Sequence, residues 1–155
     1  MSESRGLRKA VFLDRDGTIC EEMGYVNHID RLRIFPFAAE AIRQLNEADI
    51  PVIVVTNQSG VARNIFPESL VQQVHKKMIS ELAAGGAWIA GIYFCPHKTE
   101  DVCDCRKPNP GLLERAAREH GLNNPRWRRE GKGNVCPHRH YPLTISSRCL
   151  RSLAR

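Results

Sequence analysis

The amino-acid sequence predicts an α/β fold in which a doubly wound, mostly parallel sheet is covered by helices on both faces. Two observations support this prediction. Three short apolar segments of strand length alternate with segments whose apolar residues recur at three- and four-residue spacing. Polar residues suited to ligand binding follow the apolar segments directly, as they do where the carboxyl ends of parallel strands form a site. We therefore expect one domain of ordinary composition with its site at one edge of the sheet.

The first half of the chain supplies one strand-helix-strand unit. Residues 9–14 form an apolar segment that stops at Asp14, and residues 18–35 show no sustained period, so we expect an irregular excursion there. Residues 38–48 carry alanine, isoleucine and leucine at helical spacing. Residues 51–56 (Pro-Val-Ile-Val-Val-Thr) are apolar without alternation, which is typical of a parallel strand buried on both faces.

The second half continues the alternation of strands and helices. Pro67 is expected to open a helix whose apolar face, including Met78, lies in the core. Residues 91–95 predict a third strand. Asn109 is suited to cap a third helix, with Pro110 at its first helical position.

Five residues outside these patterns are assigned structural roles. His28, His75 and His120 have no partners at metal-ligand spacing, so we expect them on the surface or at helix ends. Cys20 is expected to behave as a small buried apolar residue rather than as a nucleophile. Trp88 is expected to pack against its neighbours.

The charge distribution divides the chain into two parts. Residues 1–124 carry 15 basic and 16 acidic residues, whereas residues 125–155 carry 8 and 1. The net charge of +6 therefore belongs to the end of the chain. Because residues 125–155 also show no strand or helix period, we predict a domain over residues 1–124 that lacks its last strand and helix. The remainder would be a divergent basic tail. A nucleic-acid partner, which the tail alone could suggest, is not expected.

The sequence gives no sign of a membrane or secreted protein. No stretch of about 18 apolar residues occurs, and the N-terminus lacks the apolar core of a signal peptide. The six cysteines are not spaced like those of a secreted disulfide scaffold and suit a metal site in a reducing compartment. We therefore expect a cytoplasmic, monomeric protein with no membrane partner.

Asp14 and Asp16 flank one residue at the end of the first predicted strand. Two carboxylates close together at the mouth of a parallel sheet can bind Mg²⁺ and can divide the roles of nucleophile and proton donor. A plain Asp-x-Asp-Gly turn that ends a strand is the alternative.

Two further polar segments suit an anionic ligand. Residues 56–60 (Thr-Asn-Gln-Ser-Gly) follow the second strand and offer hydroxyl, amide and backbone N–H groups to a phosphate, although a plain polar turn has the same composition. Arg106 and Lys107 precede the third helix. Lys107 could hold a phosphoryl oxygen, and the planar fork of Arg106 could bind a second anionic or polyhydroxyl group; a solvated pair of cations is the alternative.

Four residues have the spacing of a metal site: Cys95, His97, Cys103 and Cys105. Three thiolates and an imidazole can close a tetrahedral zinc site, and four protein ligands leave no position for water, so such a zinc would be structural. It would contribute on the order of 10 kcal/mol to ordering the loop. The metal would therefore position Arg106 and Lys107 rather than catalyse. The alternative to a zinc site is a set of free cysteines with no common role.

The motifs together resemble a known family. Residues 12–18 (Phe-Leu-Asp-Arg-Asp-Gly-Thr), Thr56 and Lys107 resemble the first three signature motifs of the haloacid dehalogenase superfamily of phosphotransferases. Residues 24–26 (Gly-Tyr-Val), residues 56–63 and the cysteine-histidine loop resemble the D-glycero-D-manno-heptose 1,7-bisphosphate 7-phosphatases more closely. The histidinol phosphatases share the acids and the loop and are the alternative. The resemblance implies a Rossmann-like core, a minimal cap and a zinc-binding loop.

The resemblance also implies a Mg²⁺-dependent phosphatase that acts on a phosphorylated sugar. Asp14 would attack phosphorus to form an aspartyl-phosphate, Asp16 would serve as acid and base, and both would bind Mg²⁺. Thr56 and Lys107 would offset charge on the transferred group. The substrate side would comprise nine residues: Glu22, Met23, Gly24, Tyr25, Asn57, Gln58, Ser59, Arg63 and Arg106.

The end of the chain departs from the family pattern. The fourth motif, a strand followed by Gly-Asp and a further acid that completes the Mg²⁺ site, should follow residue 122. Instead, residues 125–155 contain no aspartate, as a changed reading frame or a divergent terminus would produce. Two functions therefore compete: an active phosphatase, and a catalytically impaired, zinc-stabilised domain with weakened Mg²⁺ affinity.

Overall fold

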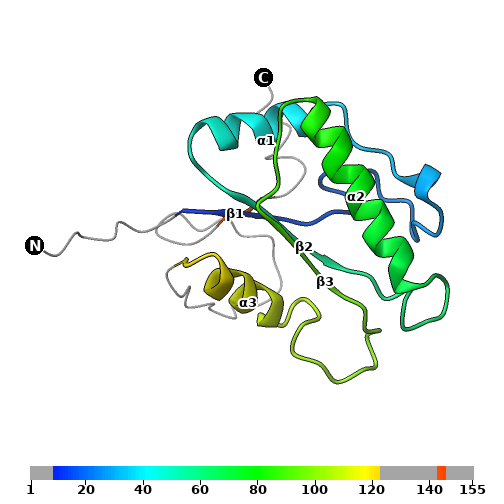
Figure 1. Ribbon diagram of the computed structural model, residues 1–155. Helices are drawn as coiled ribbons and strands as arrows, with labels where there is room; N and C mark the ends of the chain where they lie inside the picture. The colour runs from blue at the N-terminus through cyan, green and yellow to red at the C-terminus, as the bar shows by residue number, and fades with distance from the viewer. Residues whose placement is uncertain (1–8, 123–142, 146–155) are drawn as a thin grey trace, which may run out of the picture.

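Four parallel strands form the sheet in the computed structural model, which describes residues 9–122 and 143–145 (Figure 1). In spatial order they are β3 (Gly91–Cys95), β2 (Val52–Asn57), β1 (Val11–Leu13) and β4 (Leu143–Ile145). Each neighbouring pair runs parallel. The predicted α/β fold with a parallel sheet is confirmed.

Helices cover both faces of this sheet. Helices α1 (Ala38–Glu47) and α2 (Glu68–Ala84) lie on one face, and α3 (Gly111–Glu119) lies on the other (Figure 1). Strand side chains alternate between the two faces. Val11 and Val54 pack in the core beneath α1 and α2, whereas Phe12, Ile53 and Val55 pack in the core beneath α3: two separate apolar clusters result. The apolar segments without alternation are therefore strands buried on both faces, as expected.

The two clusters place most of the predicted apolar residues as expected. Met78 of α2 is fully buried in the first cluster, as predicted. Trp88 differs, because half of it (50%) is exposed, so the prediction that it packs was wrong. It lies in the turn between α2 and β3, outside both clusters, where its backbone N–H donates to the Asn46 side chain at 2.9 Å. Trp88 is exposed because it lies in the connection between α2 and β3, although its side chain is hydrophobic.

Strand β4 lies within residues 125–155, where we expected no strand, so that prediction was wrong. Leu143–Ile145 pairs in parallel with β1, with Leu13 opposite Ile145. Leu-Thr-Ile has strand propensity, but three residues are too few to show a period. Strand β1 therefore has a neighbour on each side. The predicted domain boundary at residue 124 lies outside the described residues and stays a prediction.

The excursion over residues 18–35 is irregular but packed. It contains a short 3-10 helix, η1 (Ile29–Arg31), and two isolated bridges that join Cys20 to Asp16 and to Ile34. Its apolar side chains reach the α1–α2 core: Ile19, Val26 and Leu32 are buried there. The excursion is thus fixed against the end of β1, where it can form one wall of a site.

Helix α3 begins differently from the prediction. Pro110 occupies the N-cap position without a side-chain cap, and Asn109 instead donates to the carbonyl oxygen of Cys103 at 2.8 Å, so the predicted cap was wrong. The Gly111 N–H donates to the carbonyl oxygen of Asp104 at 3.0 Å, and a Cβ at Gly111 would lie 2.6 Å from that oxygen. Glycine therefore lets the helix start directly against the cysteine-bearing loop.

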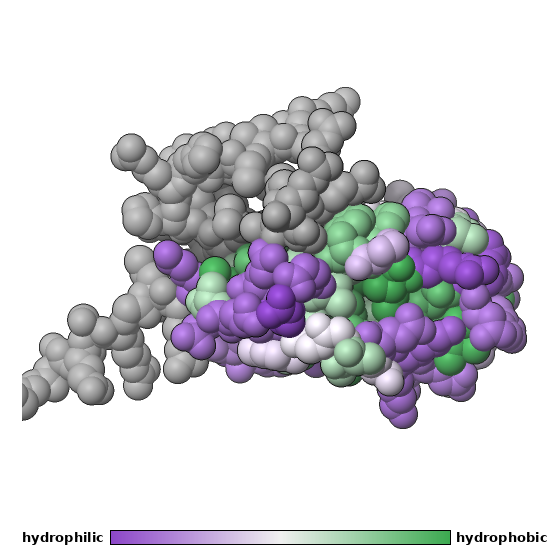
Figure 2. Space-filling view, turned by 90° about the horizontal axis from the view of Figure 1, so that it is seen from above, coloured by the Kyte–Doolittle hydropathy of each residue, from purple (hydrophilic) through white to green (hydrophobic). Residues whose placement is uncertain are grey.

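On the face seen in Figure 2, hydrophilic residues surround smaller hydrophobic areas. The large hydrophobic residues exposed within the described ranges are Tyr25, Ile65, Ile79, Trp88 and Val102. Among the described helices, none has the length and apolar character that crossing a membrane requires.

Candidate active site and a neighbouring cysteine-histidine cluster

A pocket of about 160 Å³ opens at the carboxyl ends of β1 and β2. Nine residues line it, and all of them are site residues predicted from the sequence: Asp14, Asp16, Glu22, Gly24, Tyr25, Thr56, Asn57, Gln58 and Ser59. The strands are parallel neighbours, so the polar segments that follow them meet at one edge of the sheet. The geometry brings these residues together, while their chemical roles stay predictions.

Asp14 forms an ion pair with Lys107 at this pocket. The Lys107 Nζ lies 2.7 Å from Asp14 Oδ2 and also donates to the carbonyl oxygen of Val55 at 2.8 Å. The other carboxylate oxygen of Asp14 accepts from the backbone N–H of Arg15 at 2.8 Å. The Asp14 side chain is nevertheless 41% exposed. A carboxylate held by two donors, with an open side toward the pocket, is positioned to act as a nucleophile.

Lys107 is positioned by β2 although it belongs to the loop before α3. The Asn57 side chain donates to the Lys107 carbonyl oxygen at 3.2 Å, and the Lys107 backbone N–H donates to Asn57 Oδ1 at 3.0 Å. This reciprocal pair ties the loop to the last residue of the strand. The amide of Asn57, predicted to face the substrate, therefore also fixes the backbone of Lys107.

The Asp16 carboxylate is held by Arg15, which sequence reasoning did not single out. Arg15 Nε donates to Asp16 Oδ1 at 3.0 Å, and Arg15 Nη2 donates to Asp16 Oδ2 at 2.9 Å. The Arg15 side chain is 1% exposed. The signal for this role was present in the sequence: a cation between two acids at the end of a fully apolar strand needs a partner when buried.

Gln58 joins this network instead of pointing freely into the pocket. Its Nε2 donates to Asp16 Oδ2 at 2.8 Å and to Thr56 Oγ1 at 3.0 Å, and its Oε1 accepts from Arg15 Nη2 at 3.0 Å. Thr56 is buried, and because its hydroxyl oxygen accepts from Gln58, its proton can be donated to a ligand. The Gln58 amide, predicted to contact substrate, is thus engaged with three protein groups.

His75 lies behind Arg15, so its predicted place at the surface or at a helix end was wrong. It sits within α2 and is 7% exposed, because its position falls beside Val74 on the buried side of that helix. Its Nε2 lies 3.4 Å from Arg15 Nη1. Burial, and next the Arg15 charge, lower the pKa of His75 to about 4, so the imidazole is neutral at pH 7.

The remaining isolated residues lie where the sequence placed them. His28 caps the start of η1, and His120 caps the end of α3. Cys20 is fully buried, as predicted. Burial, and next the charge of Asp16, raise the pKa of Cys20 to about 12, so this thiol stays protonated and is no nucleophile near neutral pH.

Three predicted substrate residues do not line the pocket: Met23, Arg63 and Arg106. Arg63 Nη2 lies 3.4 Å from a carboxylate oxygen of Glu100, and Arg106 Nη1 donates to the carbonyl oxygen of His97 at 3.0 Å. Met23 accepts a hydrogen bond from within the excursion through its backbone carbonyl. Both arginines therefore contact the loop between β3 and α3, and neither lines the pocket.

The four predicted metal ligands gather in that loop: Cys95, His97, Cys103 and Cys105. Their ligand atoms all lie within 4.8 Å of one another. Cys95 Sγ lies 3.1 Å from Cys105 Sγ and 3.8 Å from Cys103 Sγ, and His97 Nδ1 lies 3.2 Å from Cys105 Sγ. Tetrahedral zinc with bonds of about 2.3 Å places thiolates roughly 3.8 Å apart. The cluster could therefore bind a metal ion such as zinc.

The Cys105 thiol of this cluster is protonated without a cation. Burial, and next the hydrogen bonds with Cys95 and Cys103, raise the pKa of Cys105 to about 12. A cation must displace this proton, so metal binding would release protons and would strengthen as the pH rises.

The fit of the pocket to Mg²⁺ is partial. Asp14 offers an exposed carboxylate, which is the hard oxygen ligand that Mg²⁺ prefers. The Asp16 carboxylate is paired with Arg15, and Glu22 accepts from the Gly24 N–H at 2.9 Å. Within the described residues, the cysteine-histidine cluster is the only group of three or more His, Cys, Asp or Glu at ligand distance. Water would have to complete a Mg²⁺ shell at Asp14 and Asp16.

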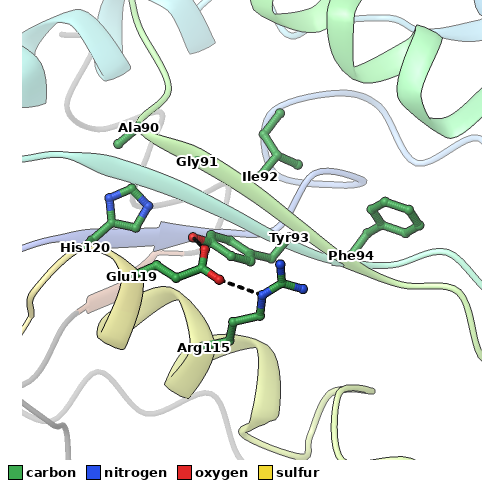
Figure 3. Close-up of a pocket in the computed structure, with 8 residues that line it drawn as sticks. All are labelled: Ala90, Gly91, Ile92, Tyr93, Phe94, Arg115, Glu119 and His120. Atoms are coloured by element: carbon green, nitrogen blue, oxygen red, sulfur yellow. Dashed lines mark hydrogen bonds and ion pairs between the residues drawn. The ribbon is translucent and has the colours of Figure 1, made fainter.

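A second hollow, of about 540 Å³, lies along β3 and does not include any predicted site residue (Figure 3). The Tyr93 hydroxyl donates to Glu119 at 2.6 Å, and Arg115 donates to the same carboxylate at 2.8 Å while its guanidinium lies 5.6 Å from the Tyr93 ring centre. These polar groups are paired with one another. The smaller pocket, where the carboxylates and the lysine meet, is therefore the candidate active site.

No family model matches the chain, but individual relatives do. The chain is 44% identical over 123 residues to the D-glycero-β-D-manno-heptose-1,7-bisphosphate 7-phosphatase of Pasteurella multocida, a match that covers 76% of this chain and 67% of that protein. It is 46% identical over 120 residues to the protein of the same name from Rhodopseudomonas palustris, covering 73% and 67%. The chain thus spans about two thirds of the length of these relatives.

A solved structure agrees with these matches. The crystal structure of a D,D-heptose 1,7-bisphosphate phosphatase from B. bronchiseptica, complexed with magnesium and phosphate, aligns with a TM-score of 0.70 at 37% identity. The alignment covers 74% of this chain and 64% of that one, which is less than two thirds of its length. A HAD-like phosphatase from Mesorhizobium loti aligns with a TM-score of 0.66 at 35% identity, covering 72% and 56%.

Proposed function

We propose that this chain, which belongs to the D-glycero-D-manno-heptose-1,7-bisphosphate 7-phosphatase family, hydrolyses the 7-phosphate of D-glycero-D-manno-heptose 1,7-bisphosphate. One observation carries the proposal: the Asp14 carboxylate faces the pocket 2.7 Å from the Lys107 ammonium. A nucleophile, a cation and the Thr56 hydroxyl at the carboxyl ends of parallel strands are groups that phosphoryl transfer needs. The names of the relatives support the substrate class.

The reaction would proceed in two halves. First, a carboxylate oxygen of Asp14 attacks phosphorus, the bond to the sugar oxygen breaks, and Asp16 gives that oxygen a proton. Asp16 then takes a proton from water, whose oxygen attacks phosphorus, so that Asp14 and inorganic phosphate are released. Thr56 and Lys107 donate hydrogen bonds to the phosphoryl oxygens in both halves. Such sites lower the barrier by on the order of 20 kcal/mol, mostly through positioning and electrostatics.

Asp14 and Asp16 are the residues proposed to hold Mg²⁺. When bound, the ion supplies positive charge that offsets the charge of the phosphoryl group. The magnesium in the related crystal structure supports this assignment, and the exposed carboxylate of Asp14 suits it. Lys107 already neutralises part of the Asp14 charge, so the carboxylate has a cation partner before any ligand arrives.

The substrate side is proposed to combine the pocket wall with the rim. Glu22 shapes the wall by accepting from Gly24, and Tyr25, which is 37% exposed, can cover one face of a sugar. Asn57 and Ser59 would complete this wall, and Met23, which lies outside the pocket lining, would contact the substrate from beside Gly24. Arg63, which follows β2 and pairs with Glu100, and Arg106 of the cysteine-bearing loop would contact the second phosphate group of the bisphosphate.

The cysteine-histidine cluster is proposed to hold a structural zinc ion. Four protein ligands would fill a tetrahedral shell, so the zinc would fix the loop that carries Arg106 and Lys107 rather than act on the substrate. Thiolate ligands persist in a reducing compartment, which supports a cytoplasmic place for the protein.

A catalytically impaired, zinc-stabilised domain is the second candidate. One observation favours it: within the described residues, no third acid joins Asp14 and Asp16 at ligand distance. Mg²⁺ would then bind weakly and phosphate release would be slow. Calorimetric titration of the full chain with Mg²⁺, with and without the substitution Asp14→Asn, separates the candidates, because the active enzyme requires binding that depends on Asp14.

Phosphate release from heptose 1,7-bisphosphate by the full chain tests the proposal. The substitution Asp14→Asn should lower the rate at least about 10³-fold, because it removes the nucleophile. The matched control is Asp30→Asn, an acid that is 79% exposed in η1 and outside the pocket, and its rate should be unchanged. Preference for histidinol phosphate would reject the heptose substrate. Activity unaffected by Asp14→Asn would reject the mechanism.

A further inference from the structure

Arg15 carries a full charge into the protein interior beside the pocket. Its side chain is 1% exposed and is the largest fully buried side chain within the described residues. A guanidinium persists in such a place only when it is paired and hydrogen-bonded, because burial removes its hydration. The groups that contact it therefore indicate what the residue does.

The first contact is a two-point pairing with Asp16. Arg15 Nε lies 3.0 Å from Asp16 Oδ1, and Arg15 Nη2 lies 2.9 Å from Asp16 Oδ2. A planar fork that meets both oxygens of a carboxylate fixes the plane of that carboxylate as well as its place. The Asp16 carboxylate thus has a defined orientation at the pocket wall, where 16% of its side chain stays exposed.

Gln58 closes the network on the pocket side. Its amide oxygen accepts from Arg15 Nη2 at 3.0 Å, and its amide nitrogen donates to Asp16 Oδ2 at 2.8 Å. The same nitrogen lies 3.0 Å from the hydroxyl oxygen of Thr56. A rotation of Asp16 would therefore break hydrogen bonds to three residues, Arg15, Gln58 and Cys20, and a shift of Arg15 would disturb the side chain that contacts Thr56.

His75 supports Arg15 from the opposite side. Its Nε2 lies 3.4 Å from Arg15 Nη1, and its ring meets the Phe94 ring edge-on at 5.7 Å between centres. An arginine nitrogen can only donate, so Nε2 is the acceptor and the imidazole carries its proton on Nδ1. The low pKa of His75 agrees with a neutral acceptor that does not repel the guanidinium. Arg15 is thus held between a histidine on α2 and an acid on the loop after β1.

We propose that Arg15 is a positioning residue for Asp16: its fork, held by His75 and Gln58, sets the orientation in which Asp16 gives a proton to the leaving oxygen. The inference rests on the proposed phosphatase function. Lysine cannot replace arginine here, because a compact ammonium cannot meet both carboxylate oxygens and Gln58 in one plane.

The test uses two substrates with different leaving groups. A sugar oxygen needs a proton as it departs, whereas p-nitrophenolate departs as an anion. In single turnovers that follow only the first half of the reaction, we expect Arg15→Lys to slow release of the sugar from heptose 1,7-bisphosphate on the order of 100-fold, since general-acid catalysis is typically worth 10²–10⁴-fold. For p-nitrophenyl phosphate, release of p-nitrophenolate in the first half should be nearly unchanged. Asp16→Asn should show the same difference between substrates.

The matched control is Arg43→Lys. Arg43 lies on α1, is 36% exposed at its side chain and pairs with Glu40 outside the pocket, so both rates should be unchanged. An equal loss of the single-turnover rate for both substrates after Arg15→Lys, or no loss for either, would overturn the proposal. If Arg15→Lys does not fold, His75→Gln decides: it should lower the sugar-phosphate rate selectively, and equal effects on both substrates would overturn the proposal.

Nuclear magnetic resonance separates this inference from the proposed function. In ¹⁵N spectra of the full chain, the Arg15 Nε–H should exchange slowly with water and should shift in Asp16→Asn but not in Asp30→Asn. If neither substrate is hydrolysed while this signature is present, the proposed function fails and the orientation of Asp16 by Arg15 stands. If the signature is absent, the positioning role is overturned whatever the activity.

Discussion

The ammonium of Lys107 lies 2.7 Å from Oδ2 of Asp14, although the two residues come from opposite ends of the described domain. The same ammonium donates to the carbonyl oxygen of Val55 on β2, so it is held between the sheet and the proposed nucleophile. The ion pair exists only when β1, β2 and the loop before α3 are all in place. The position of the Lys107 ammonium therefore depends both on the sheet and on the cysteine-bearing loop.

Replacement of this lysine tests its proposed role. Lys107→Met keeps much of the apolar stem but removes the charge, so a phosphoryl group would lose one donor in the transition state. We expect kcat for the sugar bisphosphate to fall on the order of 10²–10³-fold, as when one transition-state donor is removed elsewhere. The matched control is Lys76→Met, at an exposed position of α2, which should keep full activity. A rate for Lys107→Met within experimental error of the parent would contradict the role.

Removal of the metal should act on the same lysine through the loop. Purified protein should contain about one zinc ion per chain by plasma mass spectrometry, and Cys103→Ser should lower that content because it removes one of four ligands. Chelation should lower the melting temperature and open the loop near Lys107 to protease. Cys20→Ala is the matched control, because this cysteine is buried outside the cluster. Zinc-free protein with an unchanged melting temperature would argue against a structural metal.

The neutral state of His75 predicts a pH dependence of stability. Its pKa is about 4 in the folded protein and near 6.5 when unfolded, so the unfolded chain takes up a proton first as the pH falls. The contribution of neutral His75 to the free energy of unfolding is therefore complete above about pH 6.5 and is lost as the pH falls toward 4. This contribution is at most about 3 kcal/mol.

Urea unfolding at a series of pH values measures this contribution. The native chain should lose more free energy of unfolding between pH 6.5 and 4 than His75→Gln, because the variant has no proton to take up at this position. His28→Gln is the matched control, since His28 is 66% exposed and should behave like the parent. Parallel pH curves for the parent and His75→Gln would show that His75 is not responsible.

Much of the fold was predictable because buried parallel strands and amphipathic helices have recognisable patterns of apolar residues in a sequence. Residues 51–56 have no alternation, and β2 is indeed covered on both faces. The pocket residues were predictable for a related reason: polar residues directly after neighbouring parallel strands must meet at one edge. Strand β4 was not predictable, because Leu143–Ile145 is too short to show a period and its pairing with β1 is a long-range contact.

Side-chain environments were predicted less well than backbone elements. His75 has no sequence neighbour that reveals its partner, since Arg15 reaches it from the far end of β1. Gln58 was expected to face a ligand because amides are good phosphate donors, yet Arg15 and Asp16 engage its amide. Such assignments depend on which side chains pair with a buried charge. The sequence does not show these pairings when the partners lie far apart along the chain.

The reciprocal amide contacts between Asn57 and Lys107 have a consequence for how this domain tolerates change. They join the backbone of Lys107 to the side chain of the last residue of β2, so the position of Lys107 is fixed by the strand as well as by its own loop. The segment between His97 and Cys103, where Val102 is fully exposed, takes no part in these contacts. Insertions in this stretch can lengthen the loop while leaving the lysine in register with the sheet.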